Sequence, residues 1–212
     1  MAEASIQALA QVAARLGRAA PQRQPRGRAC PALWFFTDPQ RTADPAWTLE
    51  RLPAGAAVVF RAFGEPRAFV LGQRLRRIAA RRRLIFLVGQ DARLAARLRA
   101  DGVHLPERSM ASARALRSMH PRWRISVAVH GPRALVAAAS LPLDAVVLSA
   151  VFASDSPSAR APIGPLRFAV LARRARLPVV ALGGIDVQRA RRLIGAGAAG
   201  VAAVSALARP RT

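Results

Sequence analysis

The sequence feature with the clearest chemical meaning is a pair of glycines, Gly183 and Gly184, directly after the apolar run 179–182. Glycine has no side chain, so its backbone can turn tightly and its N–H groups stay accessible. Asp186 can cap a helix over residues 187–194, and the positive end of that helix would point at the turn. A turn of this kind is a typical binding place for a phosphate group.

A second turn of the same kind follows shortly afterwards in the chain. The run 200–204 is again short and apolar, and Ser205 comes directly after it. Buried parallel strands end at the same edge of a sheet, so the two turns are expected to lie side by side. Gly183, Gly184 and Ser205 are therefore predicted to contribute to one anion site.

These two turns belong to a longer alternation of apolar runs and helix-forming segments. Such an alternation is typical of parallel βαβ units, and eight units favour a closed (β/α)8 TIM barrel over an open sheet. Ser109 is expected to cap the helix that ends near Met119. The expected strands cover residues 33–36, 56–60, 84–88, 102–105, 125–129, 144–148, 179–182 and 200–204.

The chain is predicted to form a single barrel domain over residues 32–208, preceded by a basic extension over residues 1–31. The start of the extension, Ala2 to Leu16, has apolar residues at helical spacing. Residues 17–31 mix arginine and proline without periodicity, as a linker or arm does.

The charge of the chain is strongly positive, with 34 basic and 11 acidic residues and a formal net charge of +23. Every basic residue is arginine, which excludes Schiff-base chemistry on lysine. Such a charge suggests a polyanionic partner. However, the arginines are spread along helical segments and aromatic residues make up only 5%. Replacement of lysine by arginine throughout the composition is therefore favoured over nucleic-acid binding, and a polyanion-binding barrel without catalysis stays an alternative.

Composition also bears on where the protein works. Cys30 is the single cysteine, so the chain can form neither an internal disulfide nor a cysteine zinc cluster. No apolar stretch has the length of a membrane span, and the first residues lack the pattern of a secretory signal. A cytoplasmic protein without a membrane partner is expected.

Several pieces of the sequence together resemble one family, that of thiamine-phosphate synthase and its sister thiazole tautomerase. The resemblance covers residues 33–207, and the pieces are Thr37-Asp38, Ala100-Asp-Gly-Val-His-Leu105, Val151-Phe152, Ala161-Pro-Ile-Gly164, Pro178 to Ile185 and Gly197 to Val201. It implies a barrel that binds small phosphorylated thiazole and pyrimidine ligands. It also implies that the phosphate of a thiazole phosphate is held near Gly164, Gly183, Gly184, Val204 and Ser205.

The sequence departs from the synthase pattern at the half-site for magnesium and pyrophosphate. After the second strand, only Arg61 remains of the residues that grip pyrophosphate in the synthase. The metal-binding Asn-Asp pair falls on Gly89 and Gln90, and the second metal-binding aspartate falls on Ser109. Where the family has a basic residue, this chain has Asp155.

The resemblance implies Mg²⁺ as cofactor, and magnesium prefers carboxylate ligands beside substrate phosphates. Asp91 and Glu107 lie one and two positions from the lost ligands, so they are the candidate substitutes. A substitution of this kind redirects the side chain, so the metal half-site is interpreted as eroded.

His130 is the candidate catalytic residue that needs no metal. It follows the fifth strand, where the resemblance to the tautomerase implies a histidine that transfers a proton. A structural histidine that caps residues 131–132 is the alternative. In the loop after the sixth strand, Ser154 and Ser156 can line a lid over the substrate, or they can simply keep the loop soluble.

Three functions follow from these residues. The first is a synthase-like enzyme that joins a thiazole phosphate to an aminopyrimidine pyrophosphate, with Arg61 stabilising the departing pyrophosphate. The second is a metal-independent tautomerase-like enzyme that uses His130. The third is the barrel without catalysis that binds polyanions.

Overall fold

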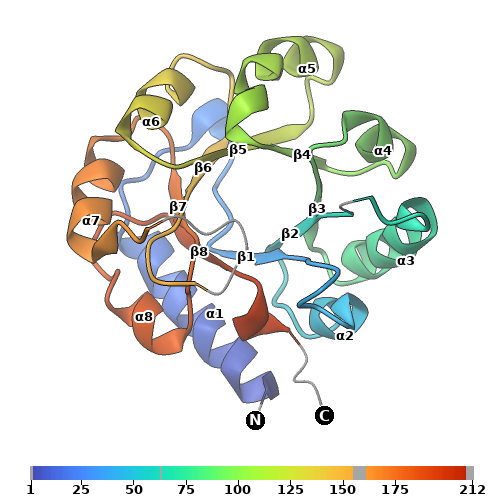
Figure 1. Ribbon diagram of the computed structural model, residues 1–212, viewed down its shortest axis with the longest axis horizontal. Helices are drawn as coiled ribbons and strands as arrows, with labels where there is room; N and C mark the ends of the chain where they lie inside the picture. Colours follow the sequence, from blue (N-terminus) through green and yellow to red (C-terminus); the bar gives the residue numbers. More distant parts are fainter. Residues whose placement is uncertain (1, 63, 155–160, 209–212) are drawn as a thin grey trace.

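The computed structural model describes residues 2–62, 64–154 and 161–208. Eight parallel strands form a closed barrel in chain order, and the last strand pairs with the first (Figure 1). The predicted (β/α)8 barrel is therefore confirmed. The strands are β1 Leu33–Phe36, β2 Ala57–Phe60, β3 Ile85–Gly89, β4 Gly102–Leu105, β5 Arg124–Val129, β6 Ala145–Leu148, β7 Val179–Ala181 and β8 Gly200–Ala203.

Helices surround the barrel, as the alternation predicts. They are α1 Ala2–Ala19, α2 Pro45–Leu49, α3 Ala68–Arg81, α4 Ala92–Arg97, α5 Ala113–Met119, α6 Pro132–Ala138, α7 Gly164–Arg174 and α8 Val187–Arg191. Three 3₁₀ turns complete the described elements, namely η1 Pro25–Gly27, η2 Glu107–Ser112 and η3 Ser205–Leu207. None of the described helices has the length and apolarity that a bilayer span requires.

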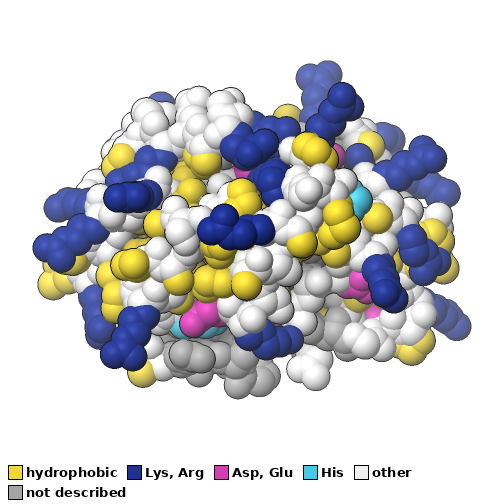
Figure 2. Space-filling view, turned by 90° about the horizontal axis from the view of Figure 1, so that it is seen from above, with side chains coloured by type: hydrophobic (Ala, Val, Ile, Leu, Met, Phe, Trp, Pro, Cys, Tyr) yellow, Lys and Arg dark blue, Asp and Glu magenta, His cyan; other side chains and the backbone are white. Residues whose placement is uncertain are grey.

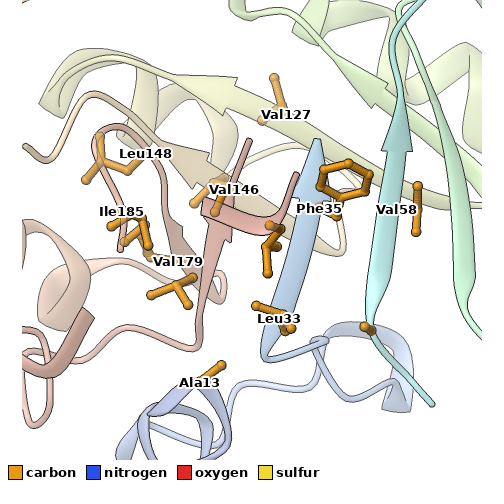
Figure 3. Close-up of a cluster of buried hydrophobic side chains, with 14 of the residues drawn as sticks. Ala13, Leu33, Phe35, Val58, Val127, Val146, Leu148, Val179 and Ile185 are labelled. Carbon is orange, nitrogen blue, oxygen red and sulfur yellow. The ribbon is translucent and has the colours of Figure 1, made fainter. Parts of the chain in front are cut away.

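Alternate residues of each strand point to opposite sides of the barrel wall, and both sides are apolar. Trp34 and Phe36 of β1 pack inside the barrel, in a cluster that includes Val59 and Val147. Leu33 and Phe35 belong to the larger cluster between the strands and the helices (Figure 3). Burial on both faces explains why the strands are mostly apolar, with His104 of β4 and Arg124 and Ser126 of β5 as the polar strand residues among those described.

The N-terminal helix α1 is part of the barrel's outer layer. It packs against α8 and β8, and Leu9 is fully buried. Figure 3 shows Ala13 of α1 pointing toward β1. Only the turn η3 follows β8 in the described residues, so α1 covers the seam where β8 meets β1.

The segment between α1 and β1 lies against the N-terminal ends of the strands. The Arg23 guanidinium donates to the carbonyl of Arg173 over 2.8 Å. The Arg28 guanidinium donates to the carbonyl of Arg122 over 2.8 Å. These contacts hold a segment that the sequence suggested to be a free arm.

One helix start and one helix end differ from the sequence predictions. Ser109 does not cap a helix, because residues 107–112 form η2 and α5 begins only at Ala113. The Ser112 hydroxyl donates to the carbonyl of Ser109, which keeps the chain in the tighter turn. The predicted helix 187–194 is shorter as well, since α8 ends at Arg191.

Candidate functional site

A cavity of about 500 Å³ lies at the C-terminal ends of the strands. The loops after β1, β2, β5, β6, β7 and β8 line it, so groups far apart in the chain meet there. Among its lining residues are Arg41, Arg61, His130, Ser149, Ser154, Gly183, Gly184, Arg189, Val204 and Ser205. Seven of these are predicted site residues, namely Arg61, His130, Ser154, Gly183, Gly184, Val204 and Ser205. The sequence did not single out the other three as site residues, namely Arg41, Ser149 and Arg189.

One end of the cavity is built from backbone. No hydrogen bond among the described residues uses the N–H groups of Gly183, Gly184 or Ser205. Both glycines have positive φ, at 102° and 61°. A Cβ on Gly184 would lie 2.1 Å from the carbonyl oxygen of Ala153, so a larger residue cannot be placed there without moving the β6 loop. The result is a concave patch of accessible donors, as an anion site requires.

The helix that follows this patch contributes less than the sequence suggested. Asp186 caps α8 as predicted, because its carboxylate accepts from the N–H of Arg189 over 2.8 Å. Since α8 has only five residues, its dipole is weak. Arg189 supplies charge instead: its Nη1 donates to the carbonyl of Gly184 over 3.0 Å, at the edge of the cavity.

The structure does not bring Gly164 to this patch. Gly164 is not among the cavity-lining residues, and its N–H donates to the carbonyl of Val151 over 3.0 Å. Ser154 does line the cavity. Ser156 and Asp155 lie outside the described residues.

Beside this patch, the loops after β1 and β2 hold two arginines around one carboxylate. Asp38 Oδ2 accepts from Arg41 Nη2 over 2.8 Å and from Arg61 Nη2 over 3.2 Å. Arg61 Nε also donates to the carbonyl of Thr37 over 2.6 Å. Two guanidinium groups beside one carboxylate leave a net positive charge on this side.

The surroundings of Asp38 and Arg61 determine how these two side chains ionise. Burial alone would raise the pKa of Asp38, but Arg41, the N–H of Gln40 and Arg61 outweigh it and lower that pKa. Burial, with Arg41 adding to it, lowers the pKa of Arg61 to about 10, against the opposing effect of Asp38. Arg61 therefore stays charged at neutral pH.

His130 lies across the barrel mouth from these groups, where β5 ends. Its Nδ1 is 3.0 Å from the carbonyl oxygen of Ser149 and 3.2 Å from the Ser149 hydroxyl. A carbonyl oxygen can only accept, so Nδ1 of the neutral ring carries the proton. Nε2 is then the nitrogen that can take up a proton, as a general base does.

His104, the histidine at the end of β4, has a different environment. It is buried, its Nδ1 is 3.0 Å from the Ser126 hydroxyl, and its ring meets Phe36 edge-on. Burial, and secondarily the charge of Arg61, lowers the pKa of His104 to about 3. His104 is thus a neutral structural residue at neutral pH.

This environment predicts a loss of stability in mild acid. The unfolded chain binds a proton on His104 below its ordinary pKa of 6.5, whereas the folded chain does so only near pH 3. The free energy of unfolding should therefore fall between pH 6.5 and about 3, by about 2 kcal/mol at pH 5. Urea unfolding at pH 7 and pH 5 measures this fall. The His104→Gln variant serves as the control, and an equal fall in both proteins would contradict the prediction.

The candidate metal ligands do not meet in the cavity. Asp91 Oδ1 accepts from the N–H of Leu94 over 2.8 Å and caps α4. Glu107 Oε2 accepts from the backbone N–H of His130 over 2.9 Å. Neither residue lines the cavity, and the described residues contain no group of three histidine, cysteine or acidic side chains that could hold a metal. Within the described ranges, the carboxylates of Asp91 and Glu107 are thus engaged elsewhere and do not form a magnesium site in the cavity.

Sequence reasoning missed Arg41 and Arg189 because they are two of 34 basic residues. A signal for both does exist. Each arginine is the last residue of an Asp-x-Gln-Arg run that follows a strand, Asp38-Pro-Gln-Arg41 after β1 and Asp186-Val-Gln-Arg189 after β7. In both runs the structure places the arginine on the cavity.

The chain is similar in sequence to known proteins. The family model described as thiamine monophosphate synthase matches residues 33–207. A thiamine biosynthesis bifunctional protein, ThiED, of Geobacter sulfurreducens is 33% identical over 137 residues, which are 65% of this chain and 28% of that protein. A thiamine-phosphate synthase of Methylobacillus flagellatus is 40% identical over 124 residues, 57% of this chain and 58% of that enzyme. This chain thus spans less than two thirds of the length of either relative.

A solved structure shows the same architecture. Thiamine phosphate pyrophosphorylase from Pyrococcus furiosus superposes with a TM-score of 0.71 at 26% identity, over 82% of this chain and 85% of that one. The family match covers the whole barrel, from β1 to η3. The chain therefore belongs to the thiamine monophosphate synthase family.

Proposed function

We propose that the cavity binds a thiazole phosphate and that His130 moves a proton on the thiazole ring. The observation that carries this proposal is the meeting, in one cavity, of unused backbone N–H groups and a histidine with a defined tautomer. A phosphate fits the first feature and a ring with an acidic proton fits the second.

The phosphate is assigned to the end of the cavity formed by β7 and β8. The N–H groups of Gly183, Gly184 and Ser205 donate to its oxygens, as accessible backbone donors do in other anion sites. Arg189 adds a positive charge at the edge of this patch. The ring of the ligand then extends across the barrel mouth toward His130, which follows β5.

The proton transfer is assigned to Nε2 of His130. The Ser149 carbonyl holds the proton of the neutral imidazole on Nδ1, so Nε2 accepts the ring proton and later returns it. The backbone N–H of His130 is fixed by Glu107, which keeps β5 and η2 together beneath the ring. This reaction requires no metal, in keeping with the positions of Asp91 and Glu107.

Synthase-type coupling is the second candidate function, and the Arg41 and Arg61 pair favours it. In that reaction the thiazole nitrogen attacks the methylene carbon of the aminopyrimidine, and the bond to pyrophosphate breaks. Two guanidinium groups held by Asp38 can bind the departing pyrophosphate through its oxygens. The names of the relatives also support this candidate.

Two assays with the intact protein test the proposal and separate the candidates. Calorimetry with thiazole phosphate should show saturable binding that chelator leaves unchanged. Deuterium exchange of the ring proton, followed by NMR, should be catalysed in the presence of chelator. Absence of binding would contradict the proposal. Magnesium-dependent formation of thiamine phosphate, without metal-free exchange, would establish the synthase reaction in its place.

A further inference from the structure

The charge of the molecule is distributed unequally between the two faces of the barrel. In a parallel barrel, all loops that lead from a helix to the next strand lie at the N-terminal ends of the strands, opposite the cavity. These loops contain ten arginines among the described residues. Arg51 pairs with Glu3 and Arg192 lies over the ring of Phe152, so these two are not counted further. The other eight are Arg23, Arg26, Arg28, Arg82, Arg83, Arg99, Arg122 and Arg176. We call this surface the N-terminal face.

Carboxylates do not neutralise the N-terminal face. Its loops contain only three, Glu50, Asp101 and Asp144, and each is paired with an arginine of a helix. No ion pair in the described ranges involves any of the eight face arginines. By contrast, the described loops on the cavity side hold six carboxylates and only four arginines, Arg41, Arg61, Arg67 and Arg108.

This difference is not what an arginine-rich composition alone produces. Arginine that merely replaces lysine is expected on every exposed surface, as the helix sides in Figure 2 show. On the N-terminal face, the segment between α1 and β1 adds Arg23 and Arg28 beside α7 and α5, where they donate to backbone carbonyls. Like charges are thus gathered on one surface, and its carboxylates pair with arginines of the helices instead.

Backbone conformation gives a second, independent observation. Four non-glycine residues among those described have positive φ, and three of them are face arginines: Arg26 at 61°, Arg83 at 54° and Arg99 at 48°. Glycine or asparagine adopts this conformation at lower cost. At Arg83 and Arg99 this conformation belongs to the turns that end α3 and α4, where the N–H groups of Leu84 and Ala100 donate back to helix carbonyls. These turns carry arginine on the N-terminal face where glycine would cost less.

An aromatic pair lies at the edge of the same face. The rings of His120 and Trp123 stack at 3.6 Å between centroids, and both residues are partly exposed. Arg28 and Arg122 flank them, since the Arg28 guanidinium donates to the Arg122 carbonyl. In sites that bind single-stranded nucleic acid, basic side chains contact the phosphates and aromatic rings stack with the bases. Both kinds of group lie side by side here.

We infer that the N-terminal face binds single-stranded RNA through its phosphate backbone, with one base stacked on the His120–Trp123 pair. A membrane surface fits less well, because of the exposed large apolar side chains in the described residues only Ile194 lies in a loop of this face. The others lie on helices, namely Val70, Met119, Val136, Leu166 and Val170. The RNA site is separate from the cavity, so it adds a second activity to the proposed function and does not depend on it.

The test uses fluorescence anisotropy of the intact protein with a labelled 20-nucleotide oligouridylate. The face variant carries Arg26→Asn, Arg83→Asn and Arg99→Asn, and asparagine suits these left-handed turns, so its melting temperature should be no lower than that of the wild type. The matched variant carries Arg74→Gln, Arg77→Gln and Arg93→Gln on the outer surfaces of α3 and α4, with the same loss of charge.

The face variant should bind RNA at least about tenfold more weakly at 0.1 M salt, and the slope of log Kd against log salt should fall by about 2. The matched variant should stay within about twofold of the wild type, and thiazole-phosphate binding should be unchanged in both. Equal losses in the two variants, or no RNA binding by the wild type, would overturn the inference. Tighter binding to phosphatidylglycerol vesicles or polyglutamate than to RNA would overturn the choice of partner.

Discussion

Replacing His130 by glutamine is expected to slow exchange of the thiazole ring proton by at least about 100-fold, because general-base catalysis contributes on the order of 10²–10⁴ to a rate. Binding of the thiazole phosphate should change by less than about threefold, since the phosphate donors on β7 and β8 remain. NMR measures the exchange rate and calorimetry the dissociation constant.

The matched control for this variant is His104→Gln. His104 is buried on Ser126, so its loss should affect stability and leave the exchange rate of the folded protein nearly unchanged. If His130→Gln retained the wild-type rate, His130 would be the structural residue that its contact with Ser149 also allows.

Replacing Ser205 by aspartate is expected to weaken thiazole-phosphate binding by about 100-fold or more. Ser205 is exposed and lines the phosphate end of the cavity, so a carboxylate fits there and repels the phosphate. Calorimetry at neutral pH measures the loss. Gly184→Asp is a poorer test, because any side chain at Gly184 meets the Ala153 carbonyl.

Ser205→Asn separates charge from size, because asparagine and aspartate have nearly the same shape. The asparagine variant should bind within about fivefold of the wild type. Equal losses in the two variants would mean that Ser205 contributes space and not an anion site. Unchanged binding in both would move the phosphate away from β8.

The barrel could be predicted from the sequence because its strands are buried on both sides. Val58 faces the helices and Val59 faces the barrel interior, so no polar residue interrupts the run. Helix starts were less predictable, because tertiary contacts decide them. Ser109 has the residue type of a cap, yet the chain forms η2 there, and Glu107 within η2 contacts the end of β5.

The candidate site was predictable where it depends on backbone, and less so where it depends on side chains. Gly183, Gly184 and Ser205 follow strands, and strand ends of a barrel meet by necessity. Gly164 looks similar in the sequence, but a hydrogen bond to Val151 uses its N–H, and only the fold reveals that partner. Arg41 and Arg189 were hidden among many arginines until the structure placed them beside Asp38 and Gly184.

The position of α1 across the seam of β8 and β1 also sets an order of events during protein synthesis. The ribosome makes α1 before all eight strands and β8 after the other seven, so the apolar side of α1, with Ile6, Leu9 and Leu16, has no β8 to cover until β8 has been made. The hydrogen bond from the Thr48 hydroxyl to the Leu207 carbonyl likewise forms only after residue 207 has been made. The barrel therefore cannot complete its fold while its last strand is still inside the ribosome, and the growing chain displays an apolar helix that chaperones can bind.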